Sequence, residues 1–105
     1  MDGIGIQLPN EAIAAFCREW KIVELALFGS VLTDHFRSDS DIDVLAQFAP
    51  DNEWSLLDRV TMREELSEIF ARKVDLVSRE GIERSHNYIR RKAILGTARV
   101  IYETA

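Results

Sequence analysis

The feature that most constrains the fold of this chain is the segment Ile22–Phe28, because it is apolar on both of the faces that a strand presents. In a strand, successive side chains point to opposite faces, so Leu25 and Leu27 lie on one face while Ala26 and Phe28 lie on the other. A strand with two apolar faces is typical of the middle of a sheet, where both faces are buried. The segment therefore predicts a central strand that is covered on both sides.

A second strand is predicted over residues 41–48, and it begins with two aspartates. Because the side-chain period of a strand is two, Asp41 and Asp43 lie on one face, while Ile42 and Val44 point to the core. Two negative charges on the same face repel each other, and a divalent cation, which prefers oxygen ligands, offsets this repulsion. The pair is a candidate metal site, with a solvated strand face as the alternative interpretation.

Between these strands, the chain passes through Gly29 and Ser30 into a short helix predicted over residues 30–35. A strand that runs into a helix presents backbone N–H groups at the positive end of that helix, which suits a phosphate. Gly29 lets a ligand approach the backbone closely, and the Ser30 hydroxyl adds a donor. Considered alone, Gly-Ser also fits an ordinary strand-to-helix turn. Because consecutive strands are usually neighbours, this turn and the aspartate pair are expected to converge.

A third strand is predicted over residues 73–78, with Val74 and Leu76 on one face and Asp75 on the other. Asp75 is therefore a third candidate carboxylate for the site, and the alternative is an ordinary charge on an edge strand. A closing apolar segment follows at residues 98–102, and its pattern does not indicate which type of secondary structure it forms.

Three longer helices are also predicted. The first begins with Asn10 as its N-cap, the longest spans residues 54–72, and the last covers residues 87–95. The first helix buries one stripe, made of Ile13, Phe16, Cys17 and Trp20. The longest helix buries a stripe that widens at its first turn, made of Met62, Leu66, Ile69 and Phe70 with Leu56, Leu57 and Val60. Its opposite face is predicted to be solvated, through Glu64, Glu65 and Glu68.

Several side chains allow two interpretations. Cys17 is interpreted as a small core residue rather than a nucleophile, since no His lies near it in the sequence. Arg59 either lies over apolar surface at the helix edge or meets a partner. The basic run at residues 90–92 is either a solvated helix face or a partner surface. His35 and His86 lack the spacing of metal ligands, so each is expected at the surface or as a residue that supports a metal ligand from behind.

Length and charge exclude several classes of function. A chain of 105 residues is expected to form one domain, which leaves little room for a separate substrate domain. Its formal net charge of -5 argues against a broad nucleic-acid surface, so no direct nucleic-acid contact is expected. No apolar run approaches the ~20 residues of a membrane span, and no secretion signal is expected. The lone cysteine agrees with a reducing compartment, and the cytoplasm is the expected location.

Together, these residues resemble a known family. Gly29-Ser30, ten further residues, Asp41-Ile42-Asp43 and then Asp75 in a short apolar strand resemble the minimal nucleotidyltransferases of the polymerase-β-like superfamily. The closer resemblance is to MntA-type antitoxins that are paired with HEPN-domain toxins. It runs from the first helix to the closing segment, and includes residues 36–40 before the aspartate pair and Arg72-Lys73 before the third strand.

The resemblance implies an α/β (α+β) fold with a small mixed sheet flanked by helices, formed by a single minimal nucleotidyltransferase domain over residues 1–105. It implies that three carboxylates hold Mg²⁺ and carry catalysis, namely Asp41, Asp43 and Asp75, the last also as a general base. It implies that the phosphates of ATP are bound by Gly29, Ser30 and Ser40. The implied reaction is transfer of AMP from ATP to a hydroxyl, with tyrosine expected, of a partner HEPN toxin in a hetero-oligomer.

One departure from the family pattern bears on function. Members often carry a basic residue shortly after Gly-Ser, whereas this chain continues with Val31, Leu32, Thr33 and Asp34. A binding-only antitoxin, which neutralises its toxin by complex formation without catalysis, is therefore the first alternative. The second alternative is a nucleotidyltransferase that acts on a small molecule or RNA. Such enzymes usually have further domains, and the net negative charge of this chain disfavours RNA binding.

Overall fold

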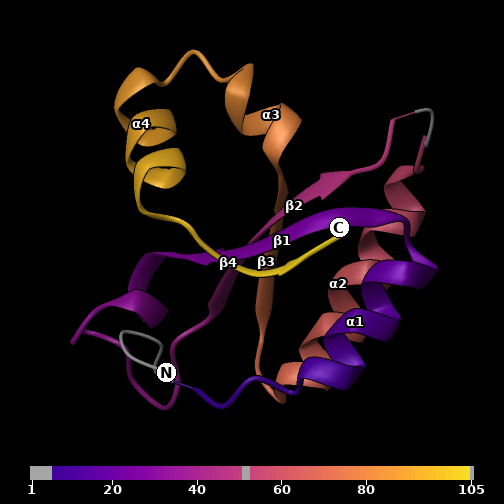
Figure 1. Ribbon diagram of the computed structural model, residues 1–105. Coiled ribbons are helices and arrows are strands. Elements are labelled where there is room, and N and C mark those ends of the chain that lie inside the picture. Colours follow the sequence, from indigo (N-terminus) through magenta and orange to yellow (C-terminus); the bar gives the residue numbers. More distant parts are fainter. Residues whose placement is uncertain (1–5, 51–52, 105) are drawn as a thin grey trace.

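The organising element of the computed structural model, which describes residues 6–50 and 53–104, is a four-stranded mixed sheet (Figure 1). Its order is β3-β2-β1-β4, and the strands are β1 (Ile22–Phe28), β2 (Ile42–Phe48), β3 (Val74–Ser78) and β4 (Arg99–Glu103). β1 is antiparallel to β2 and to β4, whereas β2 and β3 run parallel. The central position predicted for β1 is confirmed, and the closing segment forms the edge strand β4.

Helices cover both faces of the sheet, as the two apolar faces of β1 require. They are α1 (Asn10–Glu19) and α2 (Leu56–Phe70) on one face, and α3 (Arg79–Glu83) and α4 (Tyr88–Thr97) on the other (Figure 1). The larger core joins α1 and α2 to Leu25 and Leu27 of β1. The smaller core joins Ile82 of α3 and Ile94 of α4 to Phe28. The predicted fold class, a mixed sheet flanked by helices, is confirmed.

α1 buries the stripe that its periodicity predicts, because Ile13, Phe16 and Cys17 all belong to the larger core. Its start differs from the prediction. Pro9 occupies the N-cap position and Asn10 is the first helical residue, so no side chain caps this helix. The Pro9 carbonyl instead accepts the N–H of Ile13 at 3.0 Å, which closes the first turn.

α2 is shorter than predicted because local capping fixes both of its ends. The Ser55 hydroxyl accepts the N–H of Asp58 at 3.1 Å, and the Asp58 carboxylate accepts the N–H of Ser55 at 2.9 Å. This reciprocal capping box starts the helix at Leu56. At the other end, Ala71 takes a left-handed conformation with φ of 55°, which stops the helix at Phe70.

The predicted widening of the buried stripe of α2 is wrong at its first turn. Met62, Leu66 and Phe70 are buried, but Leu56 and Leu57 are 81% and 79% exposed. A helix turns by about 100° per residue, so positions five and six residues before Met62 fall away from the stripe that faces the sheet. Apolar character at the start of α2 therefore does not indicate burial.

The short helical elements also differ from the prediction. η1 (Gly29–Leu32) is a 3₁₀ turn of four residues in place of the helix predicted over residues 30–35. The N–H and the hydroxyl of Thr33 both donate to the Ser30 carbonyl at 2.9 Å, and Thr33 itself is extended, which ends the turn. α3 follows β3 directly and has no counterpart in the prediction. α4 has the predicted position, with Asn87 as its N-cap, and ends at Thr97 rather than Leu95.

Glu65 contradicts the prediction of a fully solvated face on α2. Its carboxylate accepts the indole N–H of Trp20 at 2.8 Å, which fastens α2 to the end of α1. Arg59 lies with its guanidinium carbon 5.0 Å from the centre of the Phe48 ring, so it covers apolar surface as the first of its two interpretations requires. None of the helices in the described ranges has the length and apolar character that crossing a membrane requires.

The burial of Cys17 gives a direct test of this packing. The side chain is fully buried in the larger core, and burial raises the pKa of its thiol to about 12. Because the thiolate is the reactive form, we expect the native protein to resist a disulfide reagent at about pH 8, and the urea-unfolded protein to react fully. The rate of thiol labelling with and without urea measures this difference. Equal rates in both states would contradict the core position.

Candidate functional site

The sheet register brings the candidate residues of three strands together at one end of the sheet. Asp43 of β2 pairs with Phe28, the last residue of β1, on one side and with Asp75 of β3 on the other. Leu45, two residues after Asp43, belongs to the smaller core, so Asp43 lies on the sheet face that α3 and α4 cover. Asp41 is exposed just before β2. Three carboxylates that are separated in sequence therefore share one end of the sheet.

Gly29 is the point at which the turn after β1 meets Asp43. Its φ is +79°, in the left-handed region that glycine tolerates and other residues rarely adopt. A Cβ atom at this position would overlap the carboxylate of Asp43 and would lie 3.2 Å from its Cγ. The absence of a side chain thus lets the turn after β1 pass directly beside Asp43.

The electrostatic state of Asp43 reflects this crowding. Partial burial raises the pKa of its carboxyl group, and the negative charges of Asp75 and Asp41 raise it further. The positive charge of Arg90 acts in the opposite direction and lowers the pKa of Asp43. The charged form of Asp43 is therefore held at a cost, which an added cation would reduce.

The donor chemistry at this end of the sheet fits a divalent cation such as Mg²⁺, which takes oxygen ligands. Within residues 6–50 and 53–104, no three His, Cys, Asp or Glu side chains are already arranged around one metal position. Mg²⁺ usually takes one or two carboxylates and completes its shell with water and substrate phosphates. The register pairs Asp43 with Asp75, so carboxylates suited to that requirement lie together, and the roles of Asp41, Asp43 and Asp75 as ligands stay predictions.

The loop that leads into Asp41 is held by Arg72, a contribution that we did not predict from the sequence. One terminal nitrogen of Arg72 donates to the backbone carbonyls of Arg37, Ser38 and Ser40 at 3.0 to 3.1 Å. The guanidinium also stacks on Phe36, with its central carbon 4.4 Å from the ring centre. These partners lie more than 30 residues away in the chain, so local pattern carries no signal for this clamp.

The serines predicted to contact nucleotide occupy different environments. Ser30 is half-buried in η1, directly after Gly29, and its carbonyl accepts the two bonds from Thr33. Ser40 closes the loop before β2, because its hydroxyl oxygen accepts the N–H of Arg37 at 2.9 Å. The hydroxyl hydrogen of Ser40 is still able to donate elsewhere. Nucleotide contacts by Gly29, Ser30 and Ser40 stay predictions.

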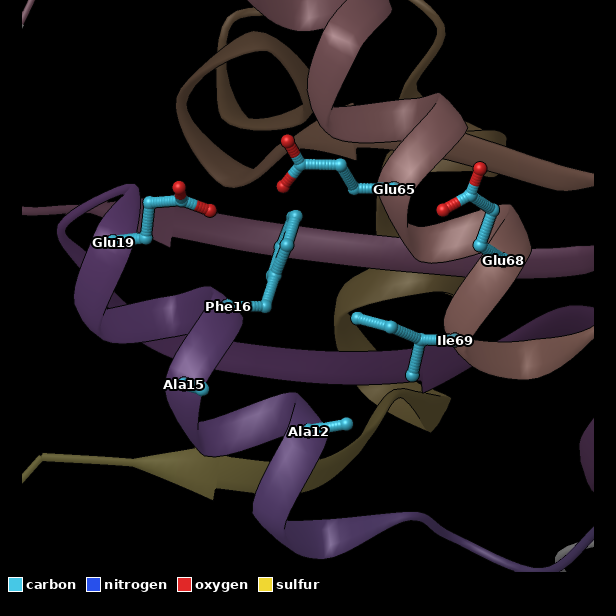
Figure 2. Close-up of a pocket in the computed structure, with 7 residues that line it drawn as sticks. All are labelled: Ala12, Ala15, Phe16, Glu19, Glu65, Glu68 and Ile69. Carbon is cyan, nitrogen blue, oxygen red and sulfur yellow. The ribbon is translucent and has the colours of Figure 1, made fainter.

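Two cavities differ in their relation to this site. A cavity of about 470 Å³ is lined by Asp41 and Asp75 together with Lys73 and Arg63. A more open groove of about 590 Å³ lies between α1 and α2, where Glu19, Glu65 and Glu68 surround an apolar floor (Figure 2). Because α1 and α2 cover the opposite face of the sheet from Asp43, this groove is not part of the site.

The raised pKa of Asp43 predicts that its ionised carboxylate lowers the stability of the folded protein at neutral pH. A carboxyl whose pKa is raised by folding contributes stability below its unfolded pKa, and this contribution is lost as the pH rises through the folded pKa. At about pH 7 we therefore expect Asp43→Asn to melt a few degrees higher than the wild type, and at about pH 3 the difference should vanish. Thermal melts at both values measure the change. A lower melting temperature of the variant at neutral pH would contradict the repulsion.

The Arg72 clamp predicts a second effect on stability. Because hydrogen bonds from charged groups contribute about 1.5–3 kcal/mol, Arg72→Ala should lower the free energy of unfolding by an amount of that order. Arg72→Lys should recover part of it, since an ammonium keeps the charge but loses the planar stacking. Urea unfolding measures both variants, with Arg63→Ala as the control that removes an exposed arginine from α2. Equal stability of Arg72→Ala and the control would contradict the clamp.

Comparison with known proteins agrees with this geometry. The family model for the nucleotidyltransferase domain matches residues 10–98. A candidate protein adenylyltransferase of Methanocaldococcus jannaschii is 33% identical over 76 residues, which cover 72% of this chain and 73% of that protein.

Solved structures share the fold. A candidate minimal nucleotidyltransferase is 30% identical, with a TM-score of 0.64 and 85% of each chain covered. A toxin–antitoxin structure with AMP-PNP has a TM-score of 0.69 at 19% identity, covering 92% of this chain and 75% of that chain. A tri-AMPylated HEPN toxin of Shewanella oneidensis in complex with an MNT antitoxin gives a TM-score of 0.61 at 21% identity, covering 90% and 70%. With its Gly-Ser turn and its three aspartates inside the matched residues, the chain belongs to the nucleotidyltransferase domain family.

Proposed function

We propose that this protein transfers AMP from ATP to a hydroxyl group of a partner protein, with Mg²⁺ as the required cation. The observation that carries the proposal is the convergence of Gly29, Asp43 and Asp75 at one end of the sheet. Membership of the nucleotidyltransferase family supports the reaction class, and the adenylyltransferase relative supports AMP as the transferred group.

In the proposed reaction, the acceptor oxygen attacks the α-phosphorus of ATP. A new phosphorus–oxygen bond forms, the bond from the α-phosphorus to the bridging oxygen breaks, and pyrophosphate leaves. Asp75 takes the proton of the acceptor hydroxyl, because it lies beside Asp43 and is exposed to solvent. When bound, Mg²⁺ neutralises phosphate charge, and Asp43 with Asp41 would hold it there.

The acceptor that we propose is a tyrosine of a HEPN-domain toxin, so that the protein acts as an antitoxin in a hetero-oligomer. Support comes from two toxin–antitoxin structures that share its fold, one with AMP-PNP and one with an AMPylated HEPN toxin. The cavity beside Asp41 and Asp75, of about 470 Å³, is where we propose that the acceptor side chain enters. Since ATP is a cytoplasmic metabolite, the proposed reaction belongs in the cytoplasm.

The decisive experiment combines the protein with Mg²⁺, α-labelled ATP and a HEPN protein encoded beside it. We expect AMP adducts on tyrosine of the partner, detected by radiolabel and by peptide mass analysis. Asp41→Asn and Asp43→Asn should each reduce labelling by about 100-fold or more, because each removes a charge from the proposed metal site. Asp39→Asn, which removes an exposed carboxylate two residues before Asp41, is the matched control and should label normally. Undiminished labelling by the Asp43→Asn variant would refute the metal assignment.

The alternative of a binding-only antitoxin has one observation in its favour, the absence of a basic residue in the four positions after Ser30. The same experiment separates it from the proposal. A partner toxin that stays inhibited without ATP and with the Asp41→Asn variant would establish neutralisation by binding alone.

A further inference from the structure

The three cations at residues 90–92 are not equivalent in the structure. Arg91 donates to the carbonyls of Ser85 and Glu83 at 3.2 and 3.5 Å, so it braces the link between α3 and α4. Lys92 lies with its ammonium 6.0 Å from the centre of the Tyr88 ring. The guanidinium of Arg90 has no hydrogen bond or ion pair with any residue in the described part of the chain. Within the described residues, Arg90 is thus the one of these three cations whose charged group makes no such contact.

The packing of α4 places Arg90 on the helix face that lies over the end of the sheet with the candidate site. Ile94 is only 6% exposed and packs in the smaller core with Phe28, and Phe28 is the strand partner of Asp43. Residues four apart lie on one face of a helix, so Arg90 shares the Ile94 face, one turn nearer the start of α4. Figure 1 shows α4 standing over the region where β1 gives way to η1. The effect of Arg90 on Asp43 agrees with this placement.

A nucleoside triphosphate brings several negative charges to this same place. The chain offers no cation in the η1 turn that follows Gly29, because residues 31–34 carry none. Arg72 is engaged at this end of the sheet, since it holds the loop before β2. Arg79 follows the far end of β3, where it pairs with Glu24 and Glu83. Lys73 and Arg63 line the cavity with Asp41 and Asp75, away from the Gly29 turn. A planar guanidinium is also the group that fits phosphate oxygens by two parallel hydrogen bonds.

We propose that Arg90 is the cationic contact for the β- and γ-phosphates of the nucleotide, supplied from α4 rather than from the turn after β1. This proposal rests on the proposed adenylyl transfer and adds to it a residue that selects a triphosphate. AMP lacks the two distal phosphates, so Arg90 contributes to affinity for ATP and not to affinity for AMP. Its charge also stabilises the pyrophosphate that leaves.

The test measures the affinity of the partner-free protein for ATP and for AMP, each with Mg²⁺, by isothermal titration calorimetry. Because a hydrogen bond to a charged group contributes about 1.5–3 kcal/mol, Arg90→Ala should weaken ATP binding on the order of 10–100-fold, with AMP binding within about two-fold. Arg90→Lys should lie between the wild type and Arg90→Ala. Lys92→Ala removes the same charge from the same helix and should leave both affinities unchanged.

The outcomes separate this proposal from the proposed function. If the wild type binds ATP and transfers AMP while Arg90→Ala binds ATP as well as the wild type, the role of Arg90 is refuted and adenylyl transfer stands. An equal loss of ATP and AMP affinity in Arg90→Ala refutes the selective contact and assigns Arg90 to the fold. If the wild type binds no ATP in the presence of Mg²⁺, both proposals fail together.

Discussion

Repulsion among carboxylates at one end of the sheet is the constraint on which the site depends. Asp43 and Asp75 are strand partners and Asp41 is two residues away, so folding places three negative charges where burial already disfavours one of them. A sequence selected only for stability would neutralise this arrangement, and Asp43→Asn is expected to do so. The protein keeps three carboxylates whose mutual repulsion a bound cation would reduce, and this is the physical basis for proposing chemistry at this location.

The surrounding structure positions the segments that carry these carboxylates. Gly29 leaves room for the Asp43 carboxylate directly beside the turn after β1. Arg72 ties the loop before Asp41 to the segment that leads into β3, through the backbone carbonyls of Arg37, Ser38 and Ser40. On the other face, α1 and α2 bury the larger core, and the Trp20–Glu65 bond joins them. The face of α1 and α2 therefore carries most of the buried core, while the candidate site lies at the end of the sheet on the face of α3 and α4.

Whether a sequence-based prediction agrees with the structure depends on how far apart in the chain the interacting residues lie. β1, β2 and β3 are predicted within one residue at each end, because apolar alternation is set by which side chains must be buried. The errors occur where short-range hydrogen bonds decide a boundary, as at Ser55 and Asp58 for α2, or where helical phase overrides apolar character, as at Leu56 and Leu57. The bond between Glu65 and Trp20 spans 45 residues, so a local pattern could only indicate a solvated glutamate there.

The sequence by itself determined the fold class, the central place of β1 and the membership of a nucleotidyltransferase family, because these depend on periodicity and on a motif of fixed spacing. The sequence also indicated the three aspartates as candidates, since two of them share a predicted strand face and the third lies in another predicted strand. Only the tertiary structure decided that Asp43 pairs with Asp75, that Arg72 holds the loop before β2 and that Ile94 of α4 packs in the same core as Phe28. Strand register and helix packing join residues dozens of positions apart, and no local pattern encodes that distance.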